Sequence, residues 1–536
     1  MSKISIMRAL LAGSVAMLAL PAAAEKITIG LSSEPTAADP HYHNVSSNNA
    51  LARHIFAYLT ARDGDQNLRG DLAENWTAED DRTWVFNLRK GVKFSNGADF
   101  DADDVIFTFC RAINNPTNVA GSFGEDLSII ESLEVIDPHR LRLRTTKVEP
   151  LLPEILGTIA ILSASTMKHD KLRYDPANGC GVSEPWPTAD AFNNGQMAVG
   201  AGPFVLESFT KGAKTVLKRN EAYHGDKPIW ETVEFIPVPT AGPRLAGLLA
   251  GDYDFIENPS ARDIPMLKDK FDHVAKDSAR VIFLQLDQRD DSPFVKAHDG
   301  RNPLKDLRVR QAINMAIDRD AIVDRIMDGF ATPANQFAPV ELFGADPDLG
   351  PIKHDPTRAK ELLAEAGYPD GFEMTLSATN DRYINDAQVS QAVAQYLARV
   401  GIKAELDSMT RSVFFTRRAA KEFSVSMGGW GNEAGGAASF LRQYVASADK
   451  DKAMGGSNYG EWSDAEFDRL ITDAVTTVDA AEREPKVAAA SARAMAELGF
   501  IPLHIESTLW AFDKDLAFDG RMDQYTLAHE IRKKAQ

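Results

Sequence analysis

The glycine-rich stretch over residues 424–440, SVSMGGWGNEAGGAASF, contains the residue types that most favour ligand binding. It starts as an alternating strand and then runs into Gly429 and Trp430, in a segment almost without bulky side chains. Glycine lets another group approach the backbone closely, and an indole ring is a flat apolar surface. The stretch therefore predicts one wall of a pocket for a small polar solute. A glycine-rich turn with Trp430 buried in the core is the alternative.

A second candidate site is the polar segment HYHNVSSNN, which follows the first predicted strand, Lys26 to Leu31. Ligands favour crevices at the ends of strands, so His43 and Asn48 are candidate contacts, with a purely structural capping loop as the alternative. His41 and His43 form an H-x-H pair, but no cysteine or third histidine is near in sequence. We therefore expect no metal and no cofactor.

Motifs of the common enzyme classes are missing from the sequence. It contains no G-x-S-x-G elbow, no Walker loop and no H-E-x-x-H pair. The paired acids Asp103 and Asp104 stand at a predicted helix start, where capping by Asp101 and the helix dipole explain them. We expect no catalytic residues and no enzymatic activity.

The first 24 residues have the pattern of a secretory signal. Lys3 and Arg8 precede a short apolar segment, and three alanines ending at Ala24 form a small-residue cleavage site. No cysteine follows that site, so we expect cleavage after Ala24, no lipid anchor and a soluble protein in the bacterial periplasm. Without Lys3 and Arg8, the formal net charge of −18 becomes −20, which argues against nucleic acid as a partner.

Cys110 and Cys180 are the only two cysteines of the chain. In an oxidising compartment they predict one disulfide, with two buried thiols as the alternative.

The order of predicted elements changes near residue 281. The first half is rich in strands and contains an irregular Pro-, Gly- and Asn-rich excursion over 170–198. From the buried strand 281–286 onward, strands and helices alternate, with a helix over 413–421 directly before the glycine-rich stretch. The chain then forms two helices, within 464–476 and 480–498, and ends in another extended segment. Such a pattern predicts an α/β protein of two or three domains.

Several segments together resemble the extracellular solute-binding proteins of peptide-type ABC importers (solute-binding family 5), which include dipeptide-, oligopeptide- and nickel-binding proteins. The likeness extends over nearly the whole mature chain. It is carried by LAENW at 72–76, TWVFNLRKGVKFSNG at 83–97, ADDV at 102–105, GPF at 202–204, NEAY at 220–223, LAGDYD at 249–254, VRQAINMAI at 309–317 and Gly429-Trp430.

This resemblance implies a two-lobed periplasmic binding protein of type II, the Venus-flytrap architecture, with an extra domain inserted in the N-terminal lobe. The implied bounds are 1–24 for the signal peptide, 25–55 with 190–280 and 495–536 for lobe I, 56–189 for the extra domain, and 281–494 for lobe II.

The resemblance also implies roles for residues around the cleft between the lobes. Oligopeptide-binding relatives have an aspartate three residues after the Gly-Trp tryptophan that pairs with the peptide amino group; here the position is Glu433, with Asn432 beside it. A solvated loop charge is the alternative for Glu433. The dipeptide-binding relative uses an arginine where this chain has Ala387 and Gln388.

Arg382, a few residues earlier, is the candidate substitute for that arginine, with a surface charge as its alternative. Its neighbour Tyr383 is a further candidate contact, with a turn role as the alternative.

The expected function is capture of a small peptide or peptide-like solute by a monomeric protein, for delivery to an inner-membrane ABC permease. An opine, a sugar conjugate or another small organic solute is the alternative ligand. A periplasmic chaperone or hydrolase on the same scaffold is the alternative from another class.

Overall fold

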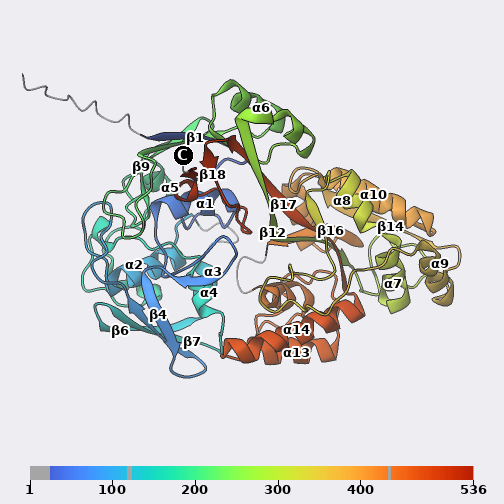
Figure 1. Ribbon diagram of the computed structural model, residues 1–536. Helices are drawn as coiled ribbons and strands as arrows, with labels where there is room; N and C mark the ends of the chain where they lie inside the picture. Colours follow the sequence, from blue (N-terminus) through green and yellow to red (C-terminus); the bar gives the residue numbers. More distant parts are fainter. Residues whose placement is uncertain (1–24, 118–122, 432–435, 535–536) are drawn as a thin grey trace, which may run out of the picture.

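Two lobes joined by long strands make up the protein in this computed structural model (Figure 1). It describes residues 25–117, 123–431 and 436–534, so the predicted signal peptide lies outside the described residues. We call the part built on β1 and β8–β11 the first lobe, and the part built on β14–β16 the second lobe. The separate sheet of β4–β7 belongs to a third unit, which we call the inserted domain.

One continuous sheet passes through both lobes, in the order β15-β14-β16-β12-β17-β11-β1-β10-β9-β8. The strands of the first lobe are β1 (Lys26–Leu31), β8 (Phe204–Thr210), β9 (Lys214–Arg219), β10 (Thr232–Pro237) and β11 (Phe255–Glu257). The strands of the second lobe are β14 (Phe372–Thr379), β15 (Ile402–Met409) and β16 (Val425–Gly431).

The two lobes are connected through β12 (Phe271–Leu286) and β17 (Phe500–Asp513), which pair with each other along most of their length. The first half of β12 lies in the first lobe, and its second half pairs with β16. Their register shifts between Asp277 and Val281, at the crossing between the lobes. The buried strand predicted over 281–286 is thus the end of a longer strand. The first half of that strand carries charged residues, so its sequence does not have the pattern of a buried strand.

Parallel strands place their carboxyl ends on the facing sides of both lobes. In the first lobe β1 is parallel to β10 and β11, and in the second lobe β14 is parallel to β15 and β16. Loops at the carboxyl ends of parallel strands are favoured places for ligands.

The inserted domain has its own four-stranded sheet, in the order β4-β5-β7-β6, and its own apolar core. Asp101 caps its main helix α2, as predicted, in a reciprocal capping box with Asp104. Almost every residue of α2 is buried, because one face packs in this core and Cys110 faces the first-lobe core. Its elements are β4 (Ala73–Ala78), β5 (Thr83–Leu88), α2 (Ala102–Ile113), α3 (Gly124–Leu127), β6 (Ile130–Asp137), β7 (Arg140–Thr145) and α4 (Leu152–Leu156).

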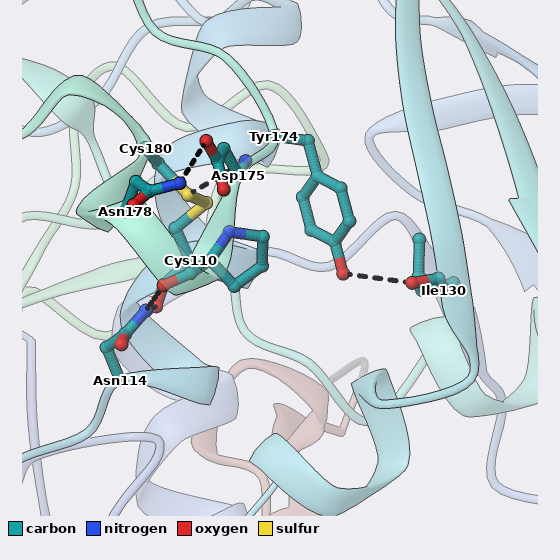
Figure 2. The surroundings of a disulfide bond; sticks show 8 residues. Cys110, Asn114, Ile130, Tyr174, Asp175, Asn178 and Cys180 are labelled. Carbon is teal, nitrogen blue, oxygen red and sulfur yellow. Dashed lines mark hydrogen bonds between the residues drawn. A yellow bond between two sulfur atoms is a disulfide. The ribbon is translucent and has the colours of Figure 1, made fainter.

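A disulfide joins Cys110 of α2 to Cys180, and the two Cα atoms are 6.3 Å apart (Figure 2). Cys180 lies in the short helical turn η2 (Pro176–Gly181) of the long excursion. Asn114 reinforces the connection, because its Nδ2 donates to the carbonyls of Cys110 and Pro176 at 2.9 and 3.1 Å. The excursion is therefore fastened to α2 by both covalent and hydrogen bonds.

Helices cover both faces of the second-lobe sheet. Two core clusters lie on opposite sides of β12 and β16, because Ile282 and Met427 point into one and Phe283 into the other. Helix α14 continues to Glu497, beyond the implied domain boundary at 494. The helices are α7 (Leu307–Ala316), α8 (Arg319–Arg325), α9 (Pro356–Glu365), α10 (Asp386–Arg399), α11 (Arg411–Ala419), α12 (Ala437–Phe440), α13 (Ala465–Val475) and α14 (Ala480–Glu497).

Candidate functional site

Gly429 lies in β16 at a place where a side chain would not fit. A Cβ atom there would come within 2.7 Å of both Ile282 Cδ1 and Tyr383 Cε1. The Tyr383 hydroxyl instead donates to the Gly429 carbonyl at 3.3 Å. The missing side chain thus allows the ring of Tyr383 to lie against the backbone of β16.

Trp430, the next residue, is half-buried. Its indole Nε1 donates to Ser439 Oγ at 3.2 Å, and its ring meets that of Tyr444 edge-on, with 5.2 Å between ring centres. The indole borders the aromatic core cluster of the second lobe, yet part of it stays accessible. Trp430 therefore packs partly like a core residue and keeps some of the exposed surface expected of a pocket wall.

The loop after β14, which carries Arg382 and Tyr383, is held by two buried carboxylates. Asp386 Oδ2 accepts hydrogen bonds from the backbone N–H groups of Arg382 and Tyr383 at 3.1 and 3.3 Å. Glu506 of β17 accepts one from the N–H of Ile384 at 2.9 Å. These hydrogen bonds fix the backbone of the loop that carries the Arg382 side chain.

Two arginines meet over one aromatic ring beside this loop. The guanidinium carbons of Arg382 and Arg418 lie 4.4 and 4.9 Å from the ring centre of Phe415 in α11. Arg382 also lies over Tyr383 at 4.8 Å. Within the described residues neither arginine has a carboxylate partner, and Arg418 Nε is buried without a hydrogen-bond acceptor. Two cations are thus positioned by aromatic stacking rather than by ion pairs.

The electrostatic surroundings of this pair carry surplus positive charge. Burial lowers the pKa of the Arg382 guanidinium, and the charges of Arg280 and Arg418 add to that effect. Arg280 itself lies 3.5 Å from the buried Glu506 carboxylate, whose pKa is raised by burial against the opposing effect of Arg280. An anion bound near Arg382 would be favoured by the uncompensated charges.

The first-lobe candidates, His43 and Asn48, have different surroundings. Asn48 is buried, and its amide bonds to Thr36, including 2.7 Å from the Thr36 N–H to Oδ1, so its hydrogen bonds hold the loop after β1. His43 is half-buried against Tyr42, and burial lowers its pKa. In the described part of the chain, neither has a hydrogen bond or ring contact to the second lobe.

Two further buried arginines fix the loops of the first lobe. Arg111 of α2 forms an ion pair with Asp39, with 2.9 and 2.5 Å contacts to the two carboxylate oxygens, and so fastens the loop after β1 to the inserted domain. Arg244 donates to the carbonyls of Val238, Glu257 and Asn258 at the carboxyl ends of β10 and β11. These contacts hold the first-lobe loops at the carboxyl ends of β1, β10 and β11.

Asn432 and Glu433 lie outside the described residues, so their predicted roles stay predictions. Arg382, Tyr383, Gly429 and Trp430 are neighbours at the carboxyl ends of β14 and β16. Sequence reasoning missed Phe415 and Arg418, although the run FFTRR places them three residues apart on one helix face. It also missed Tyr444, whose spacing reads as ordinary core.

Over residues 25–117, 123–431 and 436–534, no cluster of three or more His, Cys, Asp and Glu side chains is arranged to hold a metal ion. No helix in that part of the chain combines the length and hydropathy of a bilayer-spanning segment.

Comparison with known proteins identifies the family. The model of the bacterial extracellular solute-binding proteins, family 5 Middle, matches residues 67–452. The chain belongs to this family. It is 29% identical over 514 residues to the glutathione-binding protein GsiB of Salmonella paratyphi A, covering 94% of each chain.

Solved structures of other binding proteins share the fold. HbpA2 from Haemophilus parasuis has a TM-score of 0.78 at 24% identity and covers 95% of this chain and all of its own. The periplasmic binding protein DppA from Helicobacter pylori, in complex with the peptide STSA, has a TM-score of 0.73 at 21% identity, covering 95% and 98%. The two-lobed fold predicted from the sequence is thus confirmed.

Family 5 proteins are the solute-binding components of ABC importers, and the relatives found are binding proteins rather than enzymes. Membership of this family fits a periplasmic location and a membrane permease as partner. The expectation of a peptide-type solute-binding protein, drawn from motifs spread along the sequence, is therefore confirmed at the level of the family.

Proposed function

We propose that the protein binds a small peptide or peptide-like solute between its lobes and recognises a free carboxylate of that solute with Arg382 and Arg418. The observation that carries this proposal is the placement of both guanidinium groups over Phe415, without a carboxylate partner in the described residues. Charge-assisted hydrogen bonds from guanidinium to carboxylate are among the stronger polar contacts. Trp430 and Tyr383 line the same end of β16 and supply apolar surface.

The relatives support a solute of this class. One bears the name of a glutathione-binding protein and another was solved with the peptide STSA; both compounds end in free carboxylates. An opine or a sugar conjugate with a carboxylate would satisfy the same arginines. We infer that the acidic group, rather than a peptide bond, is the shared requirement.

Isothermal titration calorimetry tests the proposal with glutathione and STSA and with analogues in which every carboxylate is amidated; in glutathione these are the C-terminus and the α-carboxylate of the γ-glutamyl residue. The free acids should bind one to one, and the amides should bind roughly tenfold or more weakly, since one charge-assisted contact contributes about 1.5–3 kcal/mol. Arg382→Gln and Arg418→Gln should each remove most of this preference.

Arg411→Gln is the matched control, because Arg411 is exposed at the start of the same helix α11. It should bind like the parent protein. Equal affinity for acid and amide in the parent protein would contradict carboxylate recognition. Product formation during the titration would point to the hydrolase alternative, and binding to unfolded chains to the chaperone.

We also propose a mature monomer that starts at Glu25, after cleavage behind Ala24. The proposed divisions follow the implied bounds, except that lobe II extends to the end of α14 at Glu497. Mass spectrometry of protein from the periplasm would test the cleavage site, and light scattering would test the monomer.

A further inference from the structure

The inserted domain touches the second lobe on the side of the molecule opposite the crossover strands. Figure 1 shows this contact region between β7 and α4 on one side and α13 and α14 on the other. The segment that links β7 to α4 contributes Glu149 and Leu151, and the second lobe contributes Arg442 and Val478. We call these four residues the bridging contact.

An ion pair forms the polar part of the bridging contact. Arg442 Nη1 lies 3.2 and 2.9 Å from the two carboxylate oxygens of Glu149. The Arg442 side chain is 11% exposed and the Glu149 side chain 1% exposed. The charges are therefore largely desolvated, and removing one partner would leave the other buried and uncompensated.

Apolar side chains extend the bridging contact in both directions. Leu151 of the inserted domain is 5% exposed and belongs to the aromatic core cluster of the second lobe, with Phe440 and Tyr444. Val478, between α13 and α14, packs in turn against the core of the inserted domain. Each unit thus buries one side chain in its neighbour.

The bridging contact is also next to the candidate site. Arg442 belongs to the π-helical turn Leu441–Val445, which also carries Tyr444, and the Tyr444 ring lies 5.2 Å from that of Trp430. A single short turn therefore presents one side chain to the inserted domain and another to the predicted pocket wall.

We propose that the bridging contact forms only when the lobes close. It therefore contributes to the solute affinity without touching the solute. This inference rests on the proposed function, because it assumes closure of the lobes around a ligand. Opening would return Glu149 and Arg442 to water and relieve the cost of their burial. An ion pair buried inside a single domain, by contrast, would stay buried when the lobes open.

Pulsed electron–electron distance measurements on the free protein test this directly. Spin labels would be attached through Glu74→Cys in β4 and Glu484→Cys in α14, both exposed; the two native cysteines are joined to each other. Glu149→Gln should shift the distance distribution toward longer values, because the closed form then holds an unpaired Arg442. The double variant Glu149→Gln with Arg442→Gln should recover part of the short distances.

Glu134→Gln is the matched control, since Glu134 forms an exposed ion pair with Arg142 inside the same domain. It should leave the distribution unchanged. The thermal midpoint of Glu149→Gln should stay near that of the parent; a distribution identical to the parent's would overturn the inference.

Calorimetry with glutathione provides the second arm. Glu149→Gln should weaken binding about tenfold, mainly through faster release, while keeping the preference for acid over amide. Unchanged affinity would also overturn the inference. If glutathione and STSA fail to bind the parent protein, the proposed function fails for these solutes, and the distance measurement still decides the role of Glu149.

Discussion

At the scale of single residues, Gly429 shows why the Gly-Trp pair needs its glycine. We expect Gly429→Ala to lower the free energy of unfolding by about 1–3 kcal/mol, because the new methyl group overlaps Ile282 and Tyr383. The methyl group would also displace Tyr383 from its hydrogen bond to the Gly429 carbonyl, and we expect this displacement to weaken solute binding. Urea unfolding and calorimetry measure both effects. Gly242→Ala is the control, because a methyl group there meets no atom within 4 Å.

Asp104 predicts a pH dependence of stability. Burial raises its pKa to about 7, against the effect of hydrogen bonds from the N–H groups of Asp101 and Ala164. Between the unfolded pKa, near 4, and pH 7, the folded state retains a proton that the unfolded state releases. Stability therefore falls as pH rises through this window, by at most about 1.4 kcal/mol per pH unit.

Urea unfolding of the Asp104→Asn variant at several pH values measures this contribution. The variant should show a flatter decline between pH 4 and 7 than the parent protein. Parallel curves for the two proteins would show that Asp104 titrates normally in the folded state.

At this scale, the sequence singles out residues whose chemistry is local. Gly429 and Trp430 stood out because glycine and tryptophan are unusual neighbours at a strand end. Asn48 stays a predicted ligand contact, and the structure adds that its amide bonds to Thr36, a partner that only the folded loop reveals. The sequence alone does not point to Arg418, because Arg382, which lies with it over Phe415, is distant in sequence.

At the scale of elements, the disulfide makes a testable contribution. It closes a loop with a sequence separation of 70 residues between α2 and η2. By loop-closure entropy, the double variant Cys110→Ala with Cys180→Ala should lose roughly 4 kcal/mol of unfolding free energy. Urea unfolding followed by circular dichroism measures the loss. An unchanged free energy would mean that hydrogen bonds such as those of Asn114 hold the excursion by themselves.

Elements with a clear hydrophobic period were predictable, and those defined by tertiary pairing were not. The two C-terminal helices appear as α13 and α14 within the expected ranges. The first half of β12 has alternating exposed residues with charges, so only its pairing with β17 makes it a strand. The stretch between β12 and β13 (Ala331–Pro333) likewise forms two helices, α7 and α8, because the chain leaves the helical conformation at Ile317.

At the scale of the whole molecule, β12 and β17 carry the continuous sheet from one lobe to the other in the described part of the chain, while each lobe has its own core clusters. The inserted domain is bound more closely to the first lobe, since α2 buries both faces and Arg111 pairs with Asp39. We therefore expect the second lobe to be the unit that moves, with its turning point at the irregular register near Asp277.

This arrangement predicts how a solute changes thermal unfolding. In the free protein, scanning calorimetry should resolve the second lobe from the rest, because few elements join them. A solute held by both lobes stabilises the closed form by about 2.7 kcal/mol at a hundredfold excess over its Kd. The two transitions should then merge into one at higher temperature, with the carboxylate form of glutathione and not with its amide. Transitions that keep their spacing at saturation would mean that the solute contacts one lobe alone.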